Sequence, residues 1–541
     1  IWGVGFKIAD QIAQNMGFGH DSLKRITAGL LFALKEIVKN GHLYHEVNAL
    51  KQDAIKLLEL EINDDITHKL KLALHNLYDQ DKIRLISPPD EKHYVALTRY
   101  YFAERGVAHK LLKLLEYPPQ LNIDINKVYT ALRTNSDGGV ALNEDQQRAV
   151  MSSLQNKVSV ITGGPGTGKT TVIKKMLGFL DELKCKYRLA APTGRAAKRI
   201  TESTGRNAET LHRLLEFDVS TMGFTRNEQN ALDLDFLIID EASMIDIFLA
   251  HAVVKALSLG AHVIFIGDID QLPSVGAGNF LNDIIECGIV PSVRLTEIFR
   301  QAQDSLIIQN AHRINKGEFP VSFLPDAKRD FVYIKEDLPE NVPLHLEDIL
   351  KNKLPRLGIT TNKSIVLVPM NRGAVGTQKL NDDLQKILNP QETKKQLTLR
   401  GSVFKVGDRV MQIRNNYDKL IFNGDIGTIE DIHVEDRQIT VNFFERSLEY
   451  ESNELDELVL AYAITIHKSQ GSEYDAAIIP IFMQHFTLLQ RNLLYTAITR
   501  AKKLCIFIGQ SKAIGMAVRN NKSLIRTTFL QQFLTTDLKC R

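Results

Sequence analysis

The sequence predicts an α/β protein, and a few short stretches carry that prediction. Residues 158–162 form a β-branched run, residues 163–170 read GGPGTGKT, and residues 172–177 return to helical spacing. This is a strand, a glycine-rich loop and a helix, in which backbone N–H groups and a helix N-terminus can surround a phosphate group. The apolar runs 236–239 and 262–266 are each followed by carboxylates, as buried parallel strands of a nucleotide-binding sheet often are.

The glycine-rich loop predicts ATP binding. Its glycines let the backbone approach a β-phosphate where side chains would block it. Lys169 is expected to reach the β- and γ-phosphates, and the Thr170 hydroxyl to hold Mg²⁺. The residues expected to contact the nucleotide here are Gly163, Gly164, Pro165, Gly166, Thr167, Gly168, Lys169, Thr170 and Thr171. A chance match in a turn is the alternative, and the flanking strand and helix disfavour it.

Length and composition are those of an ordinary soluble protein. A chain of 541 residues is long enough for several domains, and 44% hydrophobic with 24% charged residues is average. The net charge of +3 does not decide whether nucleic acid binds, because 67 basic and 64 acidic residues can still be segregated in space. No apolar run approaches the roughly 18 residues of a membrane helix, so we expect no membrane association.

The cysteines and the first residue bear on cellular context. Cys185, Cys287, Cys505 and Cys540 are far apart and lack metal-ligand spacing. We therefore expect reduced thiols in an intracellular protein. The chain starts at Ile1 without methionine and already inside a motif, so we expect it to be a fragment of something longer.

The first 130 residues predict an accessory region. Residues 2–5 form a Gly-apolar-Gly turn before an amphipathic helix, which resembles a helix-hairpin-helix whose amides contact a DNA phosphate. An ordinary connection between helices is the alternative. Residues 21–85 show helical spacing, and a Pro-Pro break at 88–89 precedes the strand-like run 94–97. Helices followed by a small hairpin favour a winged-helix-like module.

Several polar residues around the predicted sheet are candidates for nucleotide chemistry. Gln146 opens the helix before the loop, and its amide is expected to read the adenine edge. Asp240 is expected to bind Mg²⁺ and Glu241 to polarise the attacking water. Gln271 stands where a γ-phosphate sensor would, and Arg300 is a candidate second phosphate ligand.

Five motifs in order resemble superfamily 1 DNA helicases of the RecD-like branch. They read APTGRAA from 191, IDEASM from 239, GDIDQLPSV from 267, AITIHKSQGSE from 463 and LYTAITRAK from 494. The resemblance extends over about residues 142–509, and the leading region resembles the extension of stand-alone RecD-like helicases.

The resemblance implies an ATP-dependent motor that moves 5′ to 3′ on single-stranded DNA and unwinds duplex DNA. It implies an α/β fold of two RecA-like P-loop domains with a helical amino-terminal region. The implied partners are single-stranded and forked DNA, without nuclease subunits. The implied setting is DNA repair or recombination in a bacterial cytoplasm, at the nucleoid.

The expected domains are residues 1–130 for the accessory region, 131–355 for the first motor domain and 356–541 for the second. A site shared by two lobes needs a contribution from the second lobe. In the family that contribution is Arg500, which would stabilise charge on the transferring phosphoryl group. The alternative is a surface arginine. Glu473 would bind the ribose or position its neighbours.

The motifs that face away from ATP predict the DNA contacts. Hydroxyl, imidazole and ammonium groups suit phosphates and hold a strand without reading its bases. The candidates are Thr193, Thr210, His212, Thr465, His467, Lys468 and Ser469. Structural histidines are the alternative for His212 and His467.

Two insertions interrupt the motor pattern. Residues 217–226 resemble a hairpin with a glycine turn, and in the family a pin at about 216–234 splits the duplex. Separating the strands of a DNA duplex costs about 1.4 kcal/mol per base-pair step, so a rigid wedge coupled to translocation is sufficient in principle to open it. A simple surface hairpin is the alternative. Residues 403–459 have short alternating runs between turns, which favour a small barrel resembling the SH3-like insertion of this branch.

Three other functions are alternatives to a helicase. A single-strand translocase would hydrolyse ATP without separating strands, and only a duplex substrate distinguishes it. A DNA-binding scaffold with a vestigial ATP site is disfavoured because Lys169, Asp240, Glu241 and Arg500 are all present. A nuclease is disfavoured because no carboxylate-lysine cluster stands outside these motifs.

Overall fold

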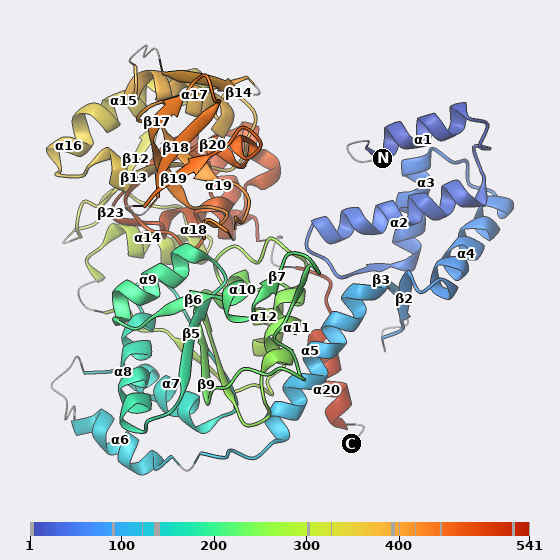
Figure 1. Cartoon of the computed structure of the whole chain (residues 1–541), viewed down its shortest axis with the longest axis horizontal. Coiled ribbons are helices and arrows are strands. Elements are labelled where there is room, and N and C mark those ends of the chain that lie inside the picture. The colour runs from blue at the N-terminus through green and yellow to red at the C-terminus, as the bar shows by residue number, and fades with distance from the viewer. Residues whose placement is uncertain are drawn as a thin grey trace.

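The computed structural model describes residues 5–88, 92–121, 123–134, 141–299, 303–325, 327–390, 395–399, 401–416, 418–443, 446–521 and 525–539. Two α/β lobes lie one above the other in Figure 1, and the N-terminal helices stand to one side of them. The long helix α5 runs from these helices along the first lobe, where it packs against α11 and α20.

The N-terminal region combines helices with a small antiparallel sheet of order β1-β3-β2. Its elements are α1 (Phe6–Asn15), α2 (Leu23–Lys39), β1 (Tyr44–Glu46), α3 (Val47–Leu58), α4 (Asp64–Asp79), β2 (Ile83–Ile86), β3 (Tyr94–Leu97), α5 (Thr98–Glu116) and α6 (Ile125–Thr134). The Ser22 and Asn63 side chains accept backbone N–H bonds at the starts of α2 and α4, which fixes where those helices begin. The predicted N-terminal turn falls partly on residues 1–4, outside the described residues.

The first lobe is a parallel sheet of order β11-β4-β10-β9-β5-β6. Its elements are α7 (Glu144–Gln155), β4 (Val158–Gly163), α8 (Lys169–Glu182), β5 (Tyr187–Ala191), α9 (Gly194–Thr204), β6 (Ala208–Thr210), α10 (Leu211–Leu214), β7 (Phe217–Asp218), β8 (Gly223–Phe224), β9 (Phe236–Ile239), η1 (Ala242–Met244), α11 (Ile247–Ala256), β10 (His262–Gly267), α12 (Phe280–Glu286) and β11 (Ser292–Leu295). Every residue of β4, β9 and β10 is buried, as expected where helices cover both faces of a parallel sheet.

The second lobe is a parallel sheet of order β12-β23-β22-β13-β21. Its elements are α14 (Leu306–Asn315), β12 (Phe331–Lys335), η2 (Pro339–Asn341), α15 (Val342–Asp348), η3 (Ile349–Lys353), α16 (Leu354–Arg356), η4 (Thr361–Lys363), β13 (Ser364–Val368), α17 (Thr377–Leu388), β21 (Ala463–Thr465), η6 (His467–Ser469), β22 (Tyr474–Ile481), η7 (Met483–Leu488), α18 (Arg491–Ile498), β23 (Ala501–Gly509) and α19 (Ser511–Arg519).

The boundary between the lobes lies upstream of the predicted residue 356. The edge strand β12 pairs with β23, and α14 shares the hydrophobic core of the second lobe through Leu306 and Ile314. An edge strand that is only partly buried gives a weak periodic signal, so the sequence did not reveal it.

The small barrel is an antiparallel sheet of order β19-β18-β17-β16-β20, preceded by the hairpin β14-β15. Its elements are β14 (Gln396–Leu399), β15 (Ser402–Lys405), β16 (Arg409–Gln412), β17 (Ile426–His433), β18 (Gln438–Phe443), β19 (Arg446–Tyr450), η5 (Leu455–Glu457) and β20 (Leu458–Leu460). Alternate residues of β18, Ile439, Val441 and Phe443, are fully buried, which is the period-two pattern of a strand with one face in a core.

The C-terminal segment departs from the predicted second motor domain. Residues 525–529 lie against the N-terminal region, where the Thr527 carbonyl accepts the Leu43 N–H at 2.9 Å and the Phe529 ring packs edge-on against Tyr44. Helix α20 (Leu530–Lys539) then packs on α5 and α12. The two ends of the chain are thereby joined across the first lobe. None of the described helices is long and apolar enough to cross a membrane.

Candidate active site between the two lobes

The phosphate loop joins β4 to α8 in a conformation that requires glycine. Gly166 and Gly168 have φ of 75° and 84°, a region that L side chains rarely adopt. A Cβ atom on Gly168 would also lie 2.4 Å from the Gln146 Nε2 atom and 2.3 Å from the Phe299 ring. The Lys169 ammonium donates to the Gly163 and Gly164 carbonyls at 2.5 and 3.1 Å, so it lies over the loop.

Gln146 has a different role from the one predicted. Its side chain is fully buried: Nε2 donates to the Thr167 carbonyl at 2.9 Å, and Oε1 accepts the Asn143 N–H at 3.2 Å. The Asn143 side chain in turn accepts the Gln146 N–H, which completes a capping box at the start of α7. Both ends of the amide are engaged inside the protein, so this arrangement does not support the expected adenine contact. Gln146 instead braces the phosphate loop.

Asp240 and Glu241 are a buried carboxylate pair at the carboxyl end of β9. They are 6% and 5% exposed. Glu241 has a left-handed backbone with φ 54° and ψ 38°, which is uncommon for a residue with a side chain and is held here by the surrounding fold. Burial is the largest influence on Asp240 and raises the pKa of its carboxyl. Burial also acts on Glu241, but the charges of nearby cations outweigh it and lower the pKa of that carboxyl.

The cation closest to this pair is Arg199 of α9, which the sequence analysis did not single out. Its Nη2 atom lies 2.6 Å from Glu241 Oε1 and 3.4 Å from Asp240 Oδ2, and its Nη1 donates to Glu473 Oε1 of the second lobe at 3.0 Å. Glu473 also bonds Lys502 at 3.1 Å. Two roles are predicted for Glu473, ribose binding and positioning of its neighbours. Its contacts with Arg199 and Lys502 suit the second role.

Arg500 follows α18 and reaches across to the first lobe. It is 2% exposed. Its Nη2 donates to Gln271 Oε1 at 3.0 Å, while Nε and Nη1 donate to the Thr496 and Ser472 carbonyls at 3.1 Å each. Arg500 is thus a buried cross-lobe contact and not the surface arginine that was the alternative.

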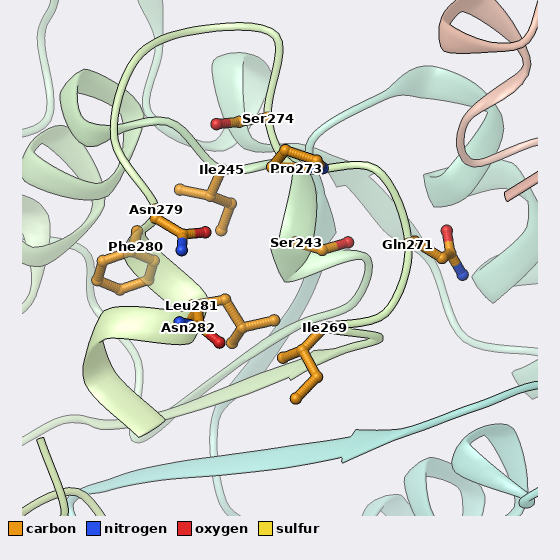
Figure 2. A pocket seen from close by; sticks show the side chains of 10 residues that line it. All are labelled: Ser243, Ile245, Ile269, Gln271, Pro273, Ser274, Asn279, Phe280, Leu281 and Asn282. Atoms are coloured by element: carbon orange, nitrogen blue, oxygen red, sulfur yellow. The ribbon is translucent and has the colours of Figure 1, made fainter. Parts of the chain in front are cut away.

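Gln271 lies on the loop after β10, between the two lobes. Figure 2 shows Gln271 at one edge of a pocket that Phe280 and Leu281 also line, with its side chain pointing away from those two residues. Its Nε2 donates to Asp268 at 3.3 Å, and the Tyr495 hydroxyl of the second lobe donates to the same carboxylate at 2.9 Å. Burial raises the pKa of Asp268 and, more strongly, that of Tyr495. Gln271 and Asp268 therefore both carry lobe-to-lobe hydrogen bonds.

A second hollow, of about 550 Å³, lies where the first lobe, the hairpin β7-β8 and the barrel meet. Three predicted DNA contacts line it, together with four phenylalanines: Thr193, Thr210, His212, Phe217, Phe224, Phe248 and Phe422. The rings of His212, Phe217 and Phe224 lie within 5.2 to 5.7 Å of one another. Burial lowers the pKa of His212, so its imidazole is neutral at pH 7.

The predicted contacts in the second lobe differ in accessibility. Lys468 is exposed and His467 half-buried, and burial lowers the pKa of His467. Thr465 is mostly buried at the end of β21, and its hydroxyl accepts the Lys468 N–H at 3.4 Å. Ser469 is fully buried and its hydroxyl donates to the Ile466 carbonyl at 2.7 Å, so the expected direct DNA contact is wrong for this residue.

Two site predictions lie at the edges of what the structure describes. Arg300 is outside the described residues. Thr170 is solvent-exposed in the first turn of α8, and its predicted contact with Mg²⁺ stays a prediction. Arg199 was missed although a signal exists: it follows Arg195 by four residues, and both arginines emerge on one face of the helix that begins after Thr193.

Models of four known families match consecutive parts of the chain. These are the ATP-dependent RecD2 DNA helicase HHH domain over residues 1–44, an AAA domain over 146–277, the ATP-dependent RecD-like DNA helicase SH3 domain over 380–443 and the UvrD-like helicase C-terminal domain over 460–508. The first two matches fall on the N-terminal region and the first lobe, the third on α17 and the barrel, and the fourth on the carboxyl-terminal part of the second lobe.

Curated relatives cover most of the chain. The ATP-dependent RecD2 DNA helicase of Deinococcus radiodurans is 31% identical over 539 residues, which is 98% of this chain and 72% of that protein. The RecBCD enzyme subunit RecD of Mycolicibacterium smegmatis is 28% identical, covering 81% of this chain and 82% of that protein. A solved structure of Pif1 helicase from Bacteroides with ADP-AlF3 and ssDNA is 22% identical over 74% of this chain and 98% of that one, with a TM-score of 0.43, a likeness too distant to carry an argument.

The long match to the Deinococcus protein and the two RecD-type family models agree with the buried site that the two lobes share. The chain belongs to the RecD2 family of ATP-dependent DNA helicases.

Proposed function

We propose that this protein hydrolyses ATP between its two lobes to move 5′ to 3′ along single-stranded DNA and to separate a duplex ahead of it. One observation carries the proposal: the hydrogen bond between Arg500 of the second lobe and Gln271 of the first, beside the phosphate loop and the carboxylate pair. A site built from two lobes can convert nucleotide binding and release into a change in their separation.

The chain's own residues supply most of the proposed chemistry. Lys169 leaves the loop carbonyls to bind the β- and γ-phosphates, and Glu241, whose pKa is lowered, accepts a proton from the attacking water. Arg500 moves from Gln271 to the γ-phosphate, where its guanidinium stabilises the charge of the transition state. The Gln271 amide then hydrogen-bonds the same phosphate, so the contact between Gln271 and Arg500 depends on whether that phosphate is present.

A magnesium ion fits the oxygen donors of this site. Thr170 and Asp240 would hold it, and it would supply positive charge to the β- and γ-phosphates. No group of three or more His, Cys, Asp or Glu side chains among the described residues is arranged to hold a metal. That fits Mg²⁺ in phosphoryl-transfer sites, which uses one or two protein ligands and completes its shell with phosphates and water.

The hollow between the first lobe, the hairpin and the barrel is the proposed path of the DNA strand. Hydroxyls of Thr193 and Thr210 suit phosphates, and the aromatic rings offer faces on which bases of any sequence can stack. The hairpin β7-β8 at its rim is the proposed wedge between the strands. Single-stranded and forked DNA are the proposed substrates, without nuclease subunits, in DNA repair or recombination at the bacterial nucleoid.

The experiment is ATP-dependent unwinding of a short duplex that carries either a 5′ or a 3′ single-stranded tail. Opening of the 5′-tailed duplex alone is the expected result. Lys169→Ala is the control and should bind DNA while losing ATP hydrolysis. Hydrolysis without opening of either substrate would replace the helicase by a single-strand translocase. Unchanged ATP turnover in Lys169→Ala would overturn the site itself.

A further inference from the structure

Helix α9 carries two arginines that face the second lobe. Arg195 and Arg199 are four residues apart and therefore share one side of the helix. Arg195 donates to Ser472 Oγ at 2.9 Å and to the Tyr474 hydroxyl at 2.7 Å, while Arg199 bonds Glu473 between them. Residues 472–474 of the second lobe thus lie along one face of a first-lobe helix.

The second lobe lies very close to the start of α9, at Gly471. A Cβ atom on Gly471 would lie 2.8 Å from Thr193 Oγ1 and 3.3 Å from the Ala196 side chain, and Gly471 itself has φ of 71°. Thr193 caps α9 by accepting the Ala196 N–H. The second lobe therefore touches α9 at its first turn, where a DNA contact is proposed, and again one turn later at Arg199.

Arg199 ties this contact to the carboxylate pair. Its guanidinium bonds Glu241 Oε1 on its own lobe and Glu473 Oε1 on the other. The planar fork of an arginine can hold two carboxylates at once in a fixed geometry, which a lysine ammonium on a flexible stem does less well. If the lobes separate, Glu473 moves away with the second lobe, and Arg199 keeps only its first-lobe contacts with Glu241 and Asp240.

We propose that Arg199 is a positioning residue that couples closure of the lobes to hydrolysis, because it holds Glu241 in its working orientation only while Glu473 of the closed second lobe holds Arg199. The contact uses Oε1 of Glu241 and leaves Oε2 to accept the proton of the attacking water. Glu473 acts through Arg199, and neither residue touches the reacting phosphate. The inference rests on the proposed ATP hydrolysis and adds to it the link between the lobes.

The first test is the kinetics of ATP hydrolysis with saturating single-stranded DNA. Arg199→Ala is expected to lower kcat by about 100-fold, the cost of a catalytic group misplaced by about 1 Å, with KM for ATP changed little. Arg199→Lys should restore only a small part of kcat. A purely structural role would not lower kcat while KM stays unchanged in a variant that folds normally.

A double-mutant cycle tests the link itself. Glu473→Gln should lower kcat, and the Arg199→Ala/Glu473→Gln double variant should lose no more than the stronger single variant. Arg206→Ala is the matched control, because Arg206 lies just beyond the end of α9, pairs with Asp181 and should keep wild-type kinetics.

The outcomes separate the two proposals. A wild-type chain that does not hydrolyse ATP would overturn both. Wild-type hydrolysis with an unchanged kcat in Arg199→Ala and Arg199→Lys would overturn only the positioning role. Independent losses that multiply in the double variant would overturn the link through Glu473. Thermal melting identifies a variant that fails to fold, in which case Arg199→Lys and Glu473→Gln carry the test.

Discussion

Arg500→Ala is the substitution that most directly tests the shared site. The guanidinium is almost completely buried, and of its four acceptors, Gln271 is the one on the first lobe. Truncation to alanine removes the proposed phosphoryl contact and leaves the Gln271 amide oxygen without its charged donor. A hydrogen bond from a charged donor contributes about 1.5–3 kcal/mol, so closure of the lobes should weaken by about 10- to 150-fold.

The loss at the transition state should be larger than the loss of closure. An arginine that stabilises the transferring phosphoryl group is worth about 10³–10⁵ in rate in related systems. We therefore expect Arg500→Ala to lower kcat by at least about 10³, while the affinity for ATP, set largely by the phosphate loop, changes far less. Arg500→Lys keeps the charge but not the planar fork and should recover only part of the rate.

The assay is steady-state ATP hydrolysis at saturating single-stranded DNA, with nucleotide binding measured separately. Arg519→Ala is the control, because Arg519 is an exposed arginine of α19 that bonds the Gly515 carbonyl within its own helix. If Arg500→Ala hydrolyses ATP with wild-type kcat, the role of Arg500 in catalysis is refuted, and its buried contacts would be structural only.

Two further predictions concern the proposed DNA path and the contact between the C-terminal segment, residues 525–529, and the N-terminal region. Phe422→Ala should weaken the binding of single-stranded DNA by about 1–3 kcal/mol, because a ring on which a base can stack is lost from the hollow. Fluorescence anisotropy measures the affinity, and Phe486→Ala, at an exposed phenylalanine outside the hollow, is the control. Equal affinities of the wild type and Phe422→Ala would exclude stacking on Phe422. Glu104 of α5 accepts the Phe529 and Leu530 N–H groups of the C-terminal segment at 2.9 and 3.0 Å. Burial raises the pKa of its carboxyl to about 7 from 4.5. Because the carboxyl holds its proton more tightly in the folded state, its contribution to the stability of the fold is full below pH 4.5 and is lost as pH rises through 7. The Tm of the wild type should therefore fall relative to the Tm of Glu104→Gln between these two pH values. Parallel curves of Tm against pH for the two proteins would contradict this.

The features that the sequence predicted well are those fixed by local motifs. The phosphate loop needs its glycines because Gly166 and Gly168 adopt positive φ, and that requirement is visible in the sequence itself. Asp240 and Glu241 follow a fully apolar run, and such a run in an α/β chain is a buried strand whose carboxyl end faces the ligand. The order of these motifs indicated two α/β lobes, with the barrel inserted in the second.

The features that the sequence did not predict depend on partners far away in the chain. Tertiary packing determines whether a buried amide or hydroxyl faces a ligand or a backbone group. The Gln146 amide bonds the Thr167 carbonyl, and the Ser469 hydroxyl bonds the Ile466 carbonyl. The Arg199–Glu473 contact joins residues 274 positions apart, and the contact of Thr527 with His42 joins residues 485 apart. No local periodicity encodes such pairs.

The loop from 271 to 278 is where these long-range contacts meet. The second lobe holds its first part, since Arg500 bonds Gln271, and Leu272 donates to Thr496 Oγ1 at 2.8 Å. The C-terminal segment holds its later part, since the Arg526 guanidinium donates to the carbonyls of residues 274, 276 and 278 at 2.7–2.9 Å. Arg526 precedes by one residue the point where the segment pairs with the N-terminal region. The loop that carries Gln271 is therefore hydrogen-bonded both to the second lobe and to the C-terminal segment that pairs with the N-terminal region.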